Sequence, residues 1–97
     1  MERITEKMLQ KKIDYLNQVT SNPKKSWERY TDGQGKQKMK ANIGNYHLDG
    51  AYGGVCLHQM MNEGGGVHSV FNCGYVPKRE LFELIRAFMC GLEVEVN

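Results

Sequence analysis

The residues of this 97-residue chain that could bind a small ligand gather in its centre. The stretch from Asn45 to Gly66 holds six of the eleven glycines and two of the three histidines. If a helix starts after Gly54, its first backbone N–H groups lack partners within the helix and attract an anion. Tyrosine rings would stack on a base there, and histidines would bond to phosphate or ribose oxygens. The residues of this predicted nucleotide or anion site are Tyr46, His47, Asp49, Tyr52, Gly53, Gly54 and His58, joined by Lys78 and Arg79 from the start of the last helix.

The glycines of this stretch have a second interpretation. Neither DGAYGG nor EGGG matches a P-loop, which ends in Gly-Lys-Ser/Thr, or the dinucleotide pattern GxGxxG. Glycine also adopts the left-handed backbone conformation that tight turns require. A set of turns that closes a small core is therefore the alternative to a ligand site.

Cysteine and histidine stand close together twice, as Cys56 with His58 and as Cys73 with His68. A nucleophilic thiol needs a base within hydrogen-bond reach, and neither pair carries a recognisable local signature. On a helix, residues two apart point in different directions, so Cys56 and His58 would diverge. The sequence predicts a protein that is not an enzyme and has no catalytic residue.

A metal centre is not expected either. It needs three or four convergent ligands, and His47 with Asp49 on one strand face supplies at most two. The cysteines Cys56, Cys73 and Cys90 are odd in number and form no CxxC pair, which favours buried thiols in a reducing cytoplasm. No metal and no cofactor is predicted.

Basic residues are concentrated in one segment, although the formal net charge is only +2. Residues 23–40 carry +4, from six Lys or Arg against Glu28 and Asp32, whereas residues 41–77 carry −2. Basic side chains interleaved with aromatic rings would hold phosphates and stack on bases. A solvated basic face without a partner is the alternative. The predicted nucleic-acid contacts are Lys24, Lys25, Trp27, Arg29, Lys36, Lys38 and Lys40.

The sequence pattern of the first half of the chain predicts a helix followed by strands. Residues 3–20 place their apolar side chains on one half of a helical wheel, and Pro23 predicts the end of that helix. Residues 27–43 alternate around a glycine-containing connection, which indicates a β-hairpin with Met39, Ala41 and Ile43 facing inward. The alternation shifts by one residue after Gly44, so a bulge or tight turn into a third strand is expected there.

The second half is expected to hold two helices and a short strand. Residues 55–62 fit a helix slightly better than a strand, and Gly64–Gly66 would suit its C-terminus. A helix starts at Pro77 and ends near Gly91, because its apolar residues form an arc and Gly91 suits the position after the last turn. Residues 92–96 alternate as LEVEV and predict a strand that adds to a sheet edge in this chain or in a second copy, with a frayed tail as the alternative.

These elements predict an α+β fold, with N-terminal and C-terminal amphipathic helices packed on a small, mainly antiparallel β-sheet. The length suits one domain over residues 1–97. The first charged residues, Glu2 and Arg3, precede any apolar run, so we expect no signal peptide, no membrane contact and a cytoplasmic location.

Residues 3–20, 42–67 and 73–92 resemble a group of small proteins encoded by phages and prophages, notably those of gut bacteria. Such accessory proteins often act by binding. They block a host protein such as a defence nuclease, as anti-CRISPR proteins do, or they sequester a nucleotide signal. The resemblance thus implies an inhibitor of a host defence protein in the cytoplasm of an infected bacterium, either alone or as a homo-oligomer. The alternatives are a nucleotide- or anion-binding module and a nucleic-acid binder that uses residues 24–40.

Overall fold

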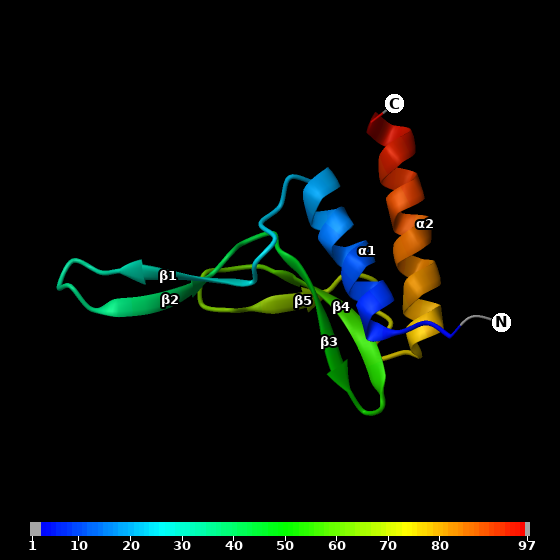
Figure 1. Cartoon of the computed structure of the whole chain (residues 1–97), viewed down its shortest axis with the longest axis horizontal. Helices are drawn as coiled ribbons and strands as arrows, with labels where there is room; N and C mark the ends of the chain where they lie inside the picture. The colour runs from blue at the N-terminus through cyan, green and yellow to red at the C-terminus, as the bar shows by residue number, and fades with distance from the viewer. Residues whose placement is uncertain (1–2, 97) are drawn as a thin grey trace.

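The computed structural model describes residues 3–96, with side chains described through Leu92. Helices stand at both ends of this part of the chain, and strands lie between them (Figure 1). The elements are α1 (Glu6–Val19), β1 (Trp27–Thr31), β2 (Gln37–Ala41), β3 (Tyr46–Ala51), β4 (Gly54–Met60), β5 (Val67–Ser69) and α2 (Lys78–Val96). The α+β class is confirmed, with two antiparallel sheets in place of one: β1 pairs with β2, and β3, β4 and β5 pair in that order.

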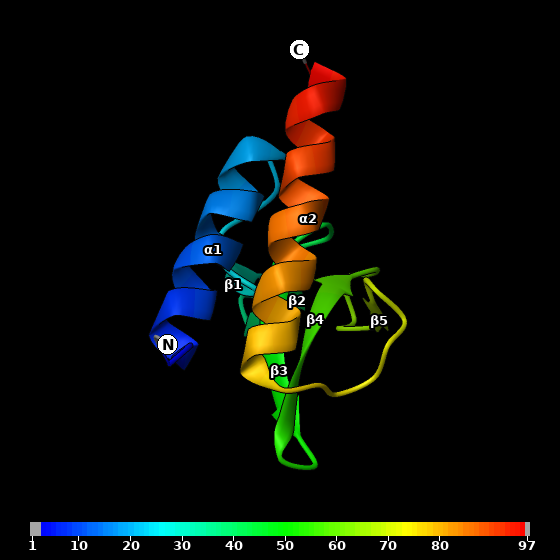
Figure 2. The same cartoon turned by 90° about the vertical axis from the view of Figure 1, so that its right-hand side faces the viewer.

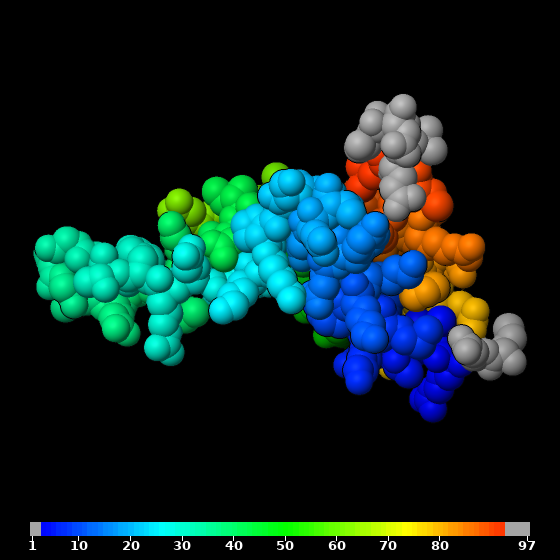
Figure 3. Space-filling model, turned by 45° about the horizontal axis from the view of Figure 1, so that its top comes forward, coloured from blue at the N-terminus to red at the C-terminus, as the bar shows by residue number. Residues whose placement is uncertain are grey.

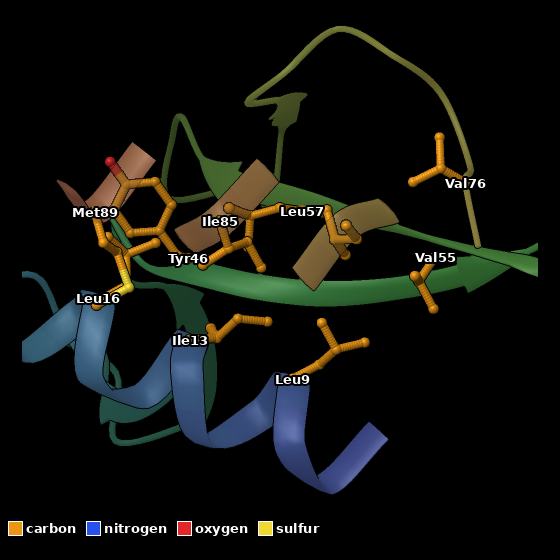
Figure 4. Close-up of a cluster of buried hydrophobic side chains, with 10 residues drawn as sticks. Leu9, Ile13, Leu16, Tyr46, Val55, Leu57, Val76, Ile85 and Met89 are labelled. Atoms are coloured by element: carbon orange, nitrogen blue, oxygen red, sulfur yellow. The ribbon is translucent and has the colours of Figure 1, made fainter. Parts of the chain in front are cut away.

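The two helices lie side by side and cover one face of the three-stranded sheet (Figure 2). On α1 the buried residues Leu9, Ile13 and Leu16 recur at the spacing of one helical face. The side chain of Thr5 caps this helix by accepting a bond of 3.2 Å from the backbone N–H of Met8. The buried cluster between helices and sheet comprises Leu9, Ile13, Leu16, Tyr46, Val55, Leu57, Val76, Leu81, Ile85 and Met89 (Figure 4).

A buried asparagine joins α1 to the edge of this sheet. Asn17 is 1% exposed, and its side chain donates to the carbonyl of Tyr46 at 3.0 Å and accepts from the backbone N–H of Tyr46 at 2.8 Å. Both unpaired backbone groups of the edge residue are therefore satisfied by one side chain. This pair of bonds fixes α1 on β3.

The connection between β3 and β4 is a two-residue hairpin turn. Tyr52 has φ 53° and Gly53 has φ 74°, which is the type I′ geometry that matches the twist of paired strands.

The prediction of a helix start after Gly54 is wrong, because residues 54–60 form β4. Val55, Cys56 and Leu57 are consecutive and all buried, so the apolar run reflects a central strand covered on both faces. Gly64–Gly66 accordingly belong to the connection from β4 to β5 and end no helix.

The C-terminal prediction also needs correction. The helix continues through Gly91 to Val96, so residues 92–96 form no strand. Leu92 is partly buried against the core, one turn beyond Phe88 and Met89, and this contact extends the helical face. Within the described residues, no helix combines the length and the apolar character needed to cross a membrane.

The pair β1–β2, which we call the arm (residues 27–41), projects from the rest of the molecule (Figures 1 and 3). The hairpin and the turn after Gly44, which has φ 92°, are confirmed. The predicted inward orientation is correct for Ala41, which is 1% exposed, and wrong for Met39 and Ile43, which are 56% and 54% exposed. The radius of gyration, 15.0 Å, exceeds the roughly 13 Å expected of a compact chain of about 100 residues.

Candidate functional site

The arm is exposed along almost its whole length, and its two faces differ. Trp27 pairs with Ala41 and Arg29 with Met39, so these four side chains share one face, as paired residues of antiparallel strands do. We call it the tryptophan face. The opposite face carries Glu28, Tyr30, Lys38 and Lys40. The predicted nucleic-acid residues are therefore divided between two surfaces.

The root of the arm is held by side-chain amides. Asn45 is fully buried, and its Nδ2 donates to the carbonyls of Pro23 at 2.8 Å and Lys24 at 3.1 Å. Its Oδ1 accepts from the hydroxyl of Ser26 at 2.8 Å. Asn42 Nδ2 donates to the carbonyl of Lys25 at 3.0 Å. The backbone of residues 23–26 is thus fixed, while the Lys24 and Lys25 side chains point to solvent.

Next to this root lies a groove of about 700 Å³, which we call the arm groove. It combines apolar and basic side chains. Among the residues that the structure describes, Lys24, Lys25 and Arg29 form no ion pair within 4.0 Å, although Glu28 is also in the lining. The groove is lined by Pro23, Lys24, Lys25, Trp27, Glu28, Arg29, Met39 and Asn42. Four of the seven predicted nucleic-acid residues thus meet at one surface.

The lysines of the opposite face have partners within the arm. Lys38 Nζ lies 3.3 Å from Asp32 Oδ2, and Lys40 Nζ lies 5.9 Å from the centre of the Tyr30 ring. Asp32 also accepts from the backbone N–H groups of Gln34 and Lys36, and these bonds lower its pKa. The arm tip is therefore organised around a carboxylate.

The residues of the predicted nucleotide site are separated by the sheet. Tyr46 is 8% exposed and packs in the core, edge to face with Phe88. Alternation places His47 and Asp49 on the face turned away from the helices. A single pocket formed by all the predicted residues is therefore absent from the described part of the chain.

The sheet face away from the helices carries a polar network, which we call the polar face: His47, Asp49, Cys56, His58, Ser69 and Tyr75. The Tyr75 hydroxyl donates to Asp49, and His58 Nδ1 lies 3.9 Å from the same carboxylate oxygen. Cys56 Sγ lies 3.3 Å from Ser69 Oγ. Cys56 and His58 share this face because they lie on a strand, against the divergence expected on a helix.

Two groups of the polar face have shifted pKa values. Burial, with the neighbouring His58 as the second cause, lowers the pKa of His47, and its Nδ1 is buried without a hydrogen-bond partner in the described part of the chain. The bond to Asp49 raises the pKa of Tyr75 to about 12. At neutral pH Tyr75 is therefore a protonated donor. Because Cys56 is only 2% exposed, its thiol is inaccessible to a substrate.

The glycines of the predicted nucleotide site lie near the N-termini of the two helices. Gly53, Gly54 and Lys78 line an open hollow of about 650 Å³ together with Arg3 and Glu6. A Cβ on Gly54 would lie 3.0 Å from the backbone N and O of Val76, so chain packing explains this glycine. Tyr52 is 95% exposed at the hairpin turn, and Arg79 lines a different hollow, beside Glu80 and Glu83.

The cysteine prediction is correct for Cys56 alone, because Cys73 and Cys90 are exposed free thiols. In the described part of the chain, no group of three or more His, Cys, Asp or Glu side chains is arranged to hold a metal ion. Sequence reasoning missed Asn45 and Tyr75, whose partners lie 19 to 26 residues away. No local pattern marks such contacts.

Comparisons with protein-family models, with curated proteins and with solved structures find no match to this chain. The resemblance to phage proteins stays a prediction.

Proposed function

We propose that this chain is a nucleic-acid-binding protein that acts without catalysis and uses the arm and its root as the contact surface. The observation that supports this proposal most strongly is that exposed basic and aromatic side chains lie together on one projecting element, the arm. The arm strands are exposed except near Ala41, and Trp27 is 42% and Tyr30 40% exposed.

The charge distribution supports this proposal. Residues 23–40 carry +4 in a chain of net charge +2, so the rest of the molecule is slightly acidic. Lysine and arginine that neutralise phosphates release condensed counterions, which makes binding favourable at low salt. The acidic remainder orients the arm toward the polyanion and keeps the body away from it.

Fluorescence anisotropy with labelled single-stranded DNA, RNA and duplex DNA tests the proposal. With three phosphate contacts, affinity for a single strand should fall by about 20-fold between about 50 and about 200 mM salt. The variant Lys24→Glu/Lys25→Glu should lose most of the binding. A matched control, Lys7→Glu/Lys11→Glu on α1, changes the net charge equally and should bind nearly as wild type. Absence of binding to every probe at low salt would refute the proposal.

A second candidate is inhibition of a host protein, such as a defence nuclease, through the arm root. Its supporting observation is a group of exposed apolar side chains on the arm and the adjacent connections: Met39 and Met61 are each 56% exposed and Ile43 is 54% exposed. Apolar residues of this kind beside a polar rim are typical of protein interfaces.

Purification of tagged chain from a bacterial host, followed by nuclease treatment of the eluate, distinguishes the two candidates. A stoichiometric protein that survives nuclease treatment and is lost in Met39→Asp/Met61→Asp supports the second candidate. Release of all co-purified protein by the nuclease treatment contradicts it.

A further inference from the structure

We propose that the arm groove selects single-stranded nucleic acid, with an unpaired base on the Trp27 ring and adjacent phosphates on Lys24, Lys25 and Arg29. This inference rests on the proposed nucleic-acid function and adds the strand class and the face that contacts it. These contacts do not distinguish DNA from RNA, because both offer bases that can stack on the Trp27 ring and phosphates that can bind the basic side chains.

One side of the Trp27 ring packs against a neighbouring connection. A Cβ on Gly65 would lie 2.7 Å from Cη2 of Trp27, so the connection between β4 and β5 touches the outer edge of the ring. The residue is still 42% exposed. Alternation places it on the groove side of the arm, next to Met39 on the paired strand. A ring that is in contact with the protein at one edge and still open to solvent suits base stacking.

Positive side chains line the same groove as this ring, on both sides of Trp27 in the sequence. Lys24 and Lys25 precede Trp27 on a segment fixed by Asn45 and Asn42, and Arg29 follows on the same strand face. Phosphates of a single strand repeat every few ångströms, so side chains on both sides of a stacked base reach successive phosphates. The groove therefore offers both kinds of contact that single strands use.

The duplex alternative fits less well. A base in a duplex is stacked on both faces, so Trp27 would have no ring to contact. Arms that enter a duplex groove commonly place an apolar wedge between base steps. The tip of this arm, residues 32–36, is DGQGK, with Asp32 bonded to the backbone of the turn and to Lys38. A carboxylate at the tip would be repelled by phosphates.

The opposite face of the arm is the internal control. Lys38 and Lys40 contribute the same charge as Lys24 and Lys25, but Asp32 and the Tyr30 ring already contact them. The inference requires binding to depend on the groove pair and to depend little on the Lys38/Lys40 pair. General attraction to a basic arm would make the two pairs equivalent.

Intrinsic fluorescence gives a direct test, because Trp27 is the single tryptophan of the chain. The probes are oligo-dT, oligo-U and a duplex hairpin of equal nucleotide number, with anisotropy of the labelled probes as the independent measure of binding. We expect both single strands to quench Trp27, and the duplex to bind at least about tenfold more weakly without quenching. Trp27→Leu should weaken single-strand binding about tenfold, and Trp27→Phe should restore most of it.

Charge reversal completes the test. Lys24→Glu/Lys25→Glu should weaken single-strand binding at least about tenfold, and Lys38→Glu/Lys40→Glu less than about threefold. Each variant is first compared with wild type by circular dichroism and thermal unfolding. Binding without quenching, equal or tighter binding of the duplex, or equal loss in the two lysine variants would overturn the inference and leave the proposed function standing. Absence of binding to all three probes would overturn the proposed function itself.

Discussion

The arm and the strand pair β3–β4 are both two-stranded antiparallel hairpins, yet they have opposite surroundings. In β4, Val55 and Leu57 are 4% and 0% exposed beneath two helices. In the arm, Met39 and Trp27 are 56% and 42% exposed, and within the described part of the chain neither helix packs extensively against it. An isolated two-stranded hairpin is marginally stable in water. The arm therefore depends on its root for stability, and its exposed face adds little to the core; in our proposal that face contacts nucleic acid.

The largest expected difference between the two hairpins is in stability. Leu57→Ala removes a fully buried side chain and should lower the free energy of unfolding by about 2 to 5 kcal/mol. Met39→Ala on the arm should change it by no more than about 0.5 kcal/mol. Urea denaturation followed by circular dichroism measures both. Similar losses for the two variants would show that the arm packs against the core.

The next effect concerns the junction between the two regions. Asn45→Ala leaves the carbonyls of Pro23 and Lys24 without their buried donor and should cost about 1 to 3 kcal/mol. Amide exchange should accelerate at Asn42, whose N–H donates to the carbonyl of Ser26 at 2.8 Å. Gln34→Ala at the exposed tip is the control and should leave exchange at Asn42 unchanged. If Asn45→Ala does not alter this amide, the root is not fixed by Asn45.

A smaller effect is the dependence of stability on pH, which should come from the sheet and not from the arm. All three histidines lie outside the arm, and burial lowers the pKa of His47. The unfolded chain therefore takes up a proton at His47 more readily, and stability contributed by its neutral form is lost as pH falls through and below the ordinary value near 6.5. Between about pH 7 and pH 5 the wild type should lose more stability than His47→Gln. Equal losses in thermal unfolding would show that His47 titrates as it does in the unfolded chain.

The comparison also explains which predictions from the sequence were correct. Periodicity identified α1, most of α2, the arm and the turn at Gly44, because each pattern reflects local geometry. The same alternation could not show that the arm has no covering layer, since that depends on where the helices pack. Residues 54–60 were misassigned because a strand buried on both faces loses its alternation, and only pairing with β3 and β5 identifies it.

The candidate site was less predictable from the sequence than the fold. Charge and aromatic content indicated the basic segment correctly as an exposed surface, but the division of its residues between two faces required the pairing register. The polar face was unpredictable as a network, because Tyr75 reaches Asp49 across β4. The prediction of the nucleotide site assumed a helix start after Gly54, and this premise is wrong, because Gly53 lies in the turn between β3 and β4 and Gly54 is the first residue of β4.

The most direct test of the central claim is the salt dependence of single-strand binding. The slope of log K against log salt concentration should be about −2 for wild type, as expected for three phosphate contacts. Lys24→Glu/Lys25→Glu should reduce the slope to about −0.7, because only the contact of Arg29 remains, and Lys38→Glu/Lys40→Glu should leave it nearly unchanged. A wild-type slope near zero, or an equal reduction in both variants, would contradict the assignment of the arm groove as the nucleic-acid contact.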